Sequence, residues 1–134
     1  MPENRERAPS LMLVIRKEQV RSLSSARMKK FAASMVSHHR KVFPEWSEKL
    51  GADGLEEFVW HGIERAGRHG FESELDVARY LHVMQALGKQ FDESPEYPWA
   101  VALLSQDLPV QDKMDRLRDA AHYEIEGRRI RSAR

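Results

Sequence analysis

The sequence predicts an all-α protein, a single-domain bundle of five or six helices around a central antiparallel helical hairpin. Apolar residues recur at steps of three and four along most of the chain, which is the spacing of one face of an α-helix. Proline and glycine stand at the ends of these periodic stretches, where they start and stop helices. The 134 residues suffice for one buried core. We expect no sheet beyond one isolated strand.

The central hairpin is predicted over residues 55–87. Its first helix carries an apolar stripe and ends at His69 and Gly70, because glycine suits the left-handed position after a helix. Ser73 then caps the second helix, with Asp76 at the third position of that helix. A turn this short predicts antiparallel packing. The two stripes are Leu55, Phe58, Val59, Gly62, Ile63 and Ala66, and then Val77, Tyr80, Leu81, Met84 and Leu87.

The other elements follow from similar signals. A helix over 25–42 should end before Pro44, because the residue preceding a proline is disfavoured in the helical region. Pro44 then starts a short helix that Gly51 stops, and Pro98 and Pro109 start the last two helices. The stripe of the last helix is Val110, Met114, Leu117, Ala121 and Ile125, with Gly127 as its expected end.

The ends of the chain are expected to lie outside the folded domain, which is predicted over 11–127. Residues 1–10 mix charges with two prolines and contain little to bury, so we expect disorder there. Residues 11–15 are expected to be a short extended segment laid across the helices. The stretch 128–134 is strongly basic and is expected to be a flexible tail.

Charge is segregated along the chain although the net charge is only +1. Residues 1–43 hold ten Lys or Arg against three Asp or Glu, whereas residues 44–112 hold five against fourteen. Residues 113–134 are basic again, with seven against four. This pattern fits either basic and acidic helices that face each other within the fold or a bipolar surface that orients a protein partner.

The sequence contains no recognisable signature of catalysis or of a metal site. There is no cysteine, and none of the six histidines has the one-turn spacing with a glutamate that a zinc-binding helix uses. His38 and His39 are adjacent, so on a helix they point about 100° apart. Glu72, Glu74 and Asp76 are explained by the helix dipole. We expect a non-catalytic protein without metal or cofactor.

Nucleic acid and membranes are not favoured as partners. A helix-turn-helix reading of the hairpin would place its acidic second helix against phosphates, which repel it. The only apolar run near the start, residues 11–15, is far too short to span a membrane or serve as a signal segment. The expected location is the cytoplasm. The oligomeric state is not determined by the sequence.

Several short segments together resemble a known group of proteins. They are Met12-Leu13-Val14-Ile15-Arg16 with Gln19, Phe43-Pro44, Gly62-Ile63-Glu64-Arg65-Ala66, Ser73-Glu74 with Asp76-Val77 and Tyr80, Leu87-Gly88 with Phe91-Asp92, and Pro98-Trp99-Ala100. The set resembles small helical proteins encoded in Gram-negative bacteria beside type VI secretion spike, tip and toxin genes. The resemblance implies an adaptor or co-chaperone that helps load a toxin effector. An immunity protein that blocks the toxin is the alternative, and a nucleic-acid-binding regulator is the second alternative.

Charge layout and resemblance together predict a surface for a protein partner. Segment 11–15 and the basic face of the helix over 25–42 are expected to form one contact surface. Trp60 lies off the apolar stripe and is a candidate anchor, because tryptophan is enriched at interfaces. The predicted binding residues are Arg16, Lys17, Arg27, Lys29, Lys30 and Trp60.

Overall fold

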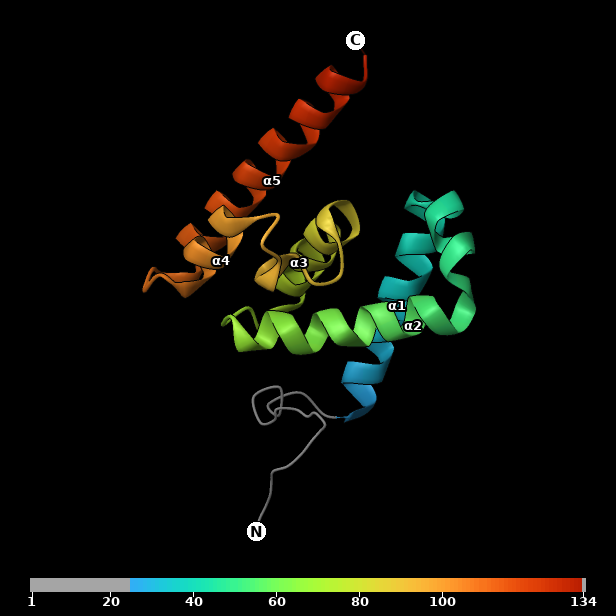
Figure 1. Ribbon diagram of the computed structural model, residues 1–134. Helices are drawn as coiled ribbons and strands as arrows, with labels where there is room; N and C mark the ends of the chain where they lie inside the picture. Colours follow the sequence, from blue (N-terminus) through green and yellow to red (C-terminus); the bar gives the residue numbers. More distant parts are fainter. Residues whose placement is uncertain (1–24, 134) are drawn as a thin grey trace.

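The computed structural model describes residues 25–133, and this part of the chain is all-α without a strand (Figure 1). The elements are α1 (Ser25–Val42), α2 (Pro44–Arg68), α3 (Glu74–Leu87), the short 3-10 helix η2 (Phe91–Glu93), α4 (Pro98–Ser105) and α5 (Val110–Ser132). The all-α prediction is confirmed. The predicted disorder of 1–10 and the extended segment 11–15 lie outside the described residues. None of the described helices is long and apolar enough to cross a membrane.

α2 is two helical segments joined at a kink, as the glycine predicted. Gly51 has φ 78° and ψ 170°, a backbone conformation that residues with a Cβ rarely adopt. The ring centroids of Trp46 and Phe58 lie 4.8 Å apart. In a straight helix, twelve residues would separate them by about 18 Å. The kink therefore folds the first segment of α2 back onto the second.

The turn between α2 and α3 has the predicted caps. Gly70 adopts φ 89°, and the Phe71 amide donates to the Ala66 carbonyl at 2.9 Å, which closes the end of α2 and directs Phe71 into the core. The Ser73 hydroxyl accepts a hydrogen bond from the Asp76 amide at 3.1 Å. These local bonds fix where one helix stops and the next begins.

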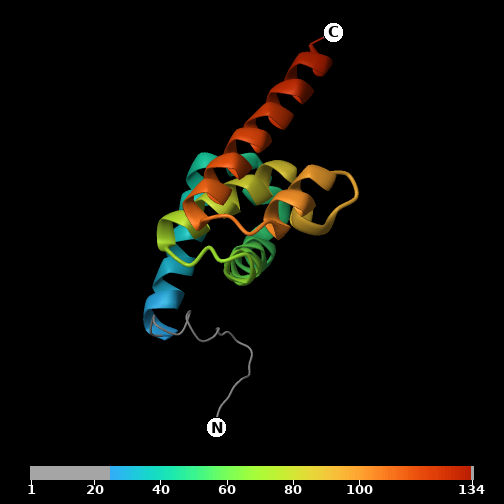
Figure 2. The ribbon, with the colours of Figure 1, turned by 90° about the vertical axis from the view of Figure 1, so that its left-hand side faces the viewer.

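α3 is the central helix of the bundle, with α2 packed on one side of it and α5 on another (Figure 1). The view turned by 90° shows α2 nearly end-on while α3 runs across the picture, so α3 crosses α2 and does not lie antiparallel beside it (Figure 2). The structure does not confirm the predicted antiparallel packing of this hairpin. Gly62 explains the crossing, because a Cβ there would overlap Leu81 and would lie 2.9 Å from the Met84 sulfur. At Gly62 the absence of a side chain lets α3 approach α2 closely.

α5 is longer than predicted. Gly127 does not end it, and the helix continues to Ser132, so most of the predicted flexible tail is helical. A glycine inside a helix costs only about 1 kcal/mol, which neighbouring contacts can offset. One such contact is Arg128, which donates to the Ala86 carbonyl at 3.2 Å and lies over the Tyr97 ring. Val110 and Ile125 of the predicted stripe are exposed, while Met114, Leu117 and Ala121 are buried.

Candidate functional site

The structure describes four of the six residues predicted to bind a partner. Lys29 and Lys30 are exposed on α1, and Arg27 is exposed beside them with its Nε 3.5 Å from the Glu74 carboxylate of α3. Trp60 is partly buried and packs against the core, so only part of its ring is accessible. Arg16 and Lys17 lie outside the described residues. The described part of the predicted site is therefore the exposed basic face of α1.

α1 has an unusual charge distribution for a helix of its length. Its eighteen residues contain five Lys or Arg and no Asp or Glu, and its first turn carries Arg27 where the helix dipole favours an acidic side chain. Within the described residues, no acidic side chain forms an ion pair with Lys29 or Lys30. Arg40 and Lys41 in the last turn are favourable to the helix dipole, whereas Arg27 in the first turn is unfavourable.

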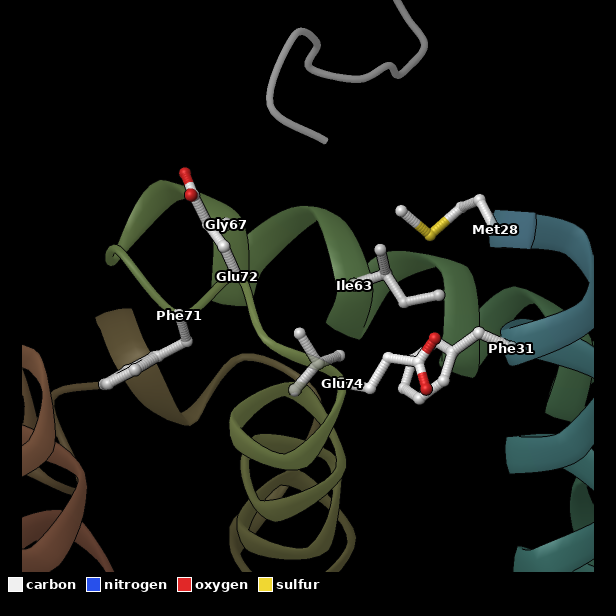
Figure 3. A pocket seen from close by; sticks show the side chains of 8 residues that line it. Met28, Phe31, Ile63, Gly67, Phe71, Glu72 and Glu74 are labelled. Carbon is white, nitrogen blue, oxygen red and sulfur yellow. The ribbon is translucent and has the colours of Figure 1, made fainter. Parts of the chain in front are cut away.

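A small crevice lies where α1, α2 and the start of α3 meet (Figure 3). Met28 and Phe31 of α1 extend toward Ile63 of α2, and the space left is about 10 Å³, close to the volume that one water needs. Glu74, which forms the ion pair with Arg27, lies at the rim of the crevice. The crevice is a filled helix junction and has no room for a small-molecule substrate.

A buried ionic network holds η2 against α2 and α3. The Asp92 side chain is fully buried, and its Oδ2 accepts hydrogen bonds from Arg65 Nε at 2.8 Å, His69 Nε2 at 2.8 Å and the Tyr80 hydroxyl at 3.0 Å. Arg65 also bonds Glu93 at 2.5 Å. The second Asp92 oxygen, Oδ1, is buried and has no hydrogen-bond partner among residues 25–133. Three donors, two from the C-terminal end of α2 and one from α3, converge on one oxygen atom of η2.

The network keeps Asp92 ionised. Burial opposes its charge, but the hydrogen bonds from His69 and Arg65 outweigh burial and lower the pKa of Asp92. The pKa of Tyr80 is raised, chiefly by burial and then by the adjacent carboxylate. Burial also disfavours the charge of Arg65, yet its bond to Asp92 raises the pKa of the guanidinium overall. These directions are typical of a structural ion pair.

The Asp92–His69 pair has the geometry in which a carboxylate orients an imidazole in some hydrolases. Neither the crevice described above nor the hollow described below is lined by Asp92, His69 or Tyr80. We assign the network to stability, and sequence spacing alone did not identify it.

A second cluster consists of histidines between α1 and α3. His38 Nε2 and His82 Nε2 lie 2.8 Å apart with nearly parallel rings, so one imidazole donates to the other. His39 is fully buried beside them, and its Nδ1 donates to the Met35 carbonyl at 2.9 Å. Burial lowers the pKa of His39 and, with the neighbouring imidazoles, that of His82. Among the described residues, no group of three or more His, Asp or Glu is arranged to hold a metal ion.

An open hollow between α4 and α5 was not predicted from the sequence. It has a volume of about 520 Å³. Trp99 of α4 is partly buried at one side, and Tyr123 of α5 is 84% exposed at the other. Apolar rings at a hollow are common at protein interfaces. The lining residues are Trp99, Arg116, Asp119, Ala120, Tyr123 and Glu124.

Comparisons with known proteins yield no relatives: the chain matches no family model, no curated protein and no solved structure.

Proposed function

We propose that this protein is a non-catalytic accessory factor that binds another protein through the basic face of α1. The supporting observation is the exposure of Lys29 and Lys30 on a helix that contains no acidic residue. Such a face is electrostatically complementary to an acidic surface on a partner. Neither the crevice at the α1–α2–α3 junction nor the hollow between α4 and α5 is lined by residues of the Asp92 network or of the histidine cluster.

The resemblance described above suggests the partner. In this proposal the protein is a cytoplasmic adaptor or co-chaperone for a type VI secretion toxin effector. An acidic surface on the effector, or on the chaperone that carries it, would meet the basic face of α1. Arg27, Lys29 and Lys30 would accelerate encounter by electrostatic steering, together with Arg16 and Lys17. Trp60, which is partly accessible, would make an apolar contact at the edge of this surface.

An immunity protein would use the same kind of surface, so the two roles need a functional test. Expression of the protein alone rescues cells from the toxin if it is an immunity protein. An adaptor does not rescue them, but its deletion prevents secretion of the effector. We expect the second result. Rescue without any effect on secretion would contradict the adaptor role while leaving the proposed basic surface intact.

The surface is tested by charge reversal. The double variant Lys29→Glu with Lys30→Glu should bind the protein encoded beside it more slowly, because long-range attraction is lost. Binding by the unaltered protein should weaken as salt rises, since the screening length falls from about 10 Å at 0.1 M to about 3 Å at 1 M. The matched control is Lys49→Glu with Arg118→Glu, which changes the net charge equally at exposed positions elsewhere.

The helical circular dichroism of both double variants should equal that of the unaltered protein, because all four side chains are exposed. If the α1 variant associates as fast as the control variant, the basic face is solvated surface and the proposal fails. Preferential binding of nucleic acid to the same face, lost in the α1 variant, would instead support the nucleic-acid alternative.

A further inference from the structure

α5 has a second apolar stripe on the side that faces away from the core. The buried residues Met114, Leu117 and Ala121 define the inner face of this helix. Ala120, Tyr123, Gly127 and Ile130 are spaced by three, four and three residues, which places them together on the opposite side. Tyr123 is 84% exposed and Ile130 is 51% exposed. This outer stripe also borders the hollow that Trp99 lines.

The C-terminal end of the stripe lies on the part of α5 that extends beyond the other helices. In both ribbon views the last turns of α5 project past α3 and α4 (Figures 1 and 2). Gly127 stands in the middle of the stripe, where a Cβ would meet only the flexible end of the Arg131 side chain. A glycine at this point exposes the helix backbone and permits close approach of another helix.

Charge along this segment is divided into two blocks. Residues 119–126 contain three acidic residues and no Lys or Arg, whereas residues 127–131 contain three arginines and no Asp or Glu. Two copies that pair in parallel would place like charges side by side. Arg128 is held against Ala86 and Tyr97, and Arg129 pairs with Glu126 of its own helix. Two copies that pair antiparallel would therefore place chiefly Arg131 of one copy beside the acidic block of the other. The boundary between the blocks, at Gly127, would then lie on the two-fold axis.

We propose that the outer stripe of α5 is a self-association surface, on which a second copy of this chain packs its own α5 antiparallel. Tyr123 and Ile130 supply the apolar contact, Gly127 allows the close crossing, and the exchanged charge blocks set the direction. Trp99 extends the contact onto α4. The interface is short, so the dimer belongs to the small, concentration-dependent class. This inference is independent of the basic face of α1, which lies on another helix.

Sedimentation velocity of the full chain over a range of concentrations tests the association. We expect a monomer–dimer equilibrium in which the dimer becomes weaker as the salt concentration rises. Replacing Tyr123 and Ile130 together by serine should abolish the dimer. The control Leu75→Ser removes another exposed apolar side chain, 59% exposed on α3, and should leave the equilibrium unchanged. Circular dichroism confirms that each variant remains helical.

A charge-swap mixture tests the charge blocks directly. Glu124→Arg with Glu126→Arg makes the segment basic throughout, and Arg129→Glu with Arg131→Glu makes its exposed charges largely acidic. Each double variant alone should dimerise about tenfold more weakly, a change typical of several exposed charge pairs. An equimolar mixture of the two variants should regain association as a heterodimer. A mixture that associates no better than either variant alone would refute the charge argument.

Cysteine cross-linking tests the direction, and the chain has no native cysteine to interfere. In the antiparallel dimer, Gly127→Cys should form an intermolecular disulfide readily. Ala120→Cys should not, because its two copies would lie about 20 Å apart, well beyond the roughly 7 Å that a disulfide can span. Equal cross-linking at both positions would show parallel pairing. The proposal would be overturned if the chain stayed monomeric at every concentration. This holds also if the stripe bound a different protein while the chain stayed monomeric.

Discussion

Replacement of Asp92 by asparagine should be the most destabilising conservative change in the described structure. The substitution preserves the shape of the side chain but removes the charge that pairs with Arg65, whose side chain is only 15% exposed. It also weakens the acceptor for His69 and the buried Tyr80 hydroxyl. Removing one partner of a buried ion pair typically costs about 3–5 kcal/mol. Because Glu93 still bonds Arg65, we expect the lower end, about 3 kcal/mol.

Such a loss is a large share of the 5–15 kcal/mol that stabilises a typical domain. It should lower Tm by about 12 °C, at roughly 4 °C per kcal/mol for a domain of this size. Urea unfolding at pH 7 provides the free energy, and a thermal scan provides Tm. The matched control is Glu93→Gln, which removes a carboxylate from the same arginine at a site that is 57% exposed. The control should cost less than about 1 kcal/mol.

The difference between wild type and Asp92→Asn should depend on pH. The pKa of Asp92 is lower in the folded protein than its ordinary value of 3.8. The stabilisation is therefore fully present above the ordinary pKa and is lost as pH falls through the lowered one. The two proteins should approach each other in stability only in that acidic range. If Asp92→Asn costs no more than Glu93→Gln at pH 7, the network does not stabilise the fold as described.

Two further predictions concern the core. Gly62→Ala should lower the free energy of unfolding in urea by about 1–3 kcal/mol, because the added Cβ overlaps Leu81. The control Gly67→Ala, whose Cβ would meet nothing within 4 Å, should raise it by up to about 1 kcal/mol. Equal effects of the two substitutions would contradict the close crossing. Because the pKa of buried His39 lies below 6.5, the unfolded chain binds more protons and the free energy of unfolding should fall as pH drops below 6.5. His39→Leu should reduce this fall, and an unchanged pH dependence would show that His39 does not contribute.

The sequence by itself determined the helices and their ends. Periodicity predicted the elements, and local chemistry predicted where they stop, as at Gly51, Gly70 and the Ser73 cap. These features depend on a few neighbouring residues and their backbone angles, so they can be read from a short window. Gly127 is the exception. A glycine of ordinary helical conformation does not stop a helix whose next residue, Arg128, is held by another part of the fold.

Only the tertiary structure decided how the helices cross and which polar groups meet. Nothing in the sequence spacing of Arg65, Tyr80 and Asp92 shows that they converge on one carboxylate oxygen. The same holds for His38 and His82, which are 44 residues apart and share a hydrogen bond. Such contacts depend on helix crossing, which is set by close packing at positions such as Gly62, summed over the whole core.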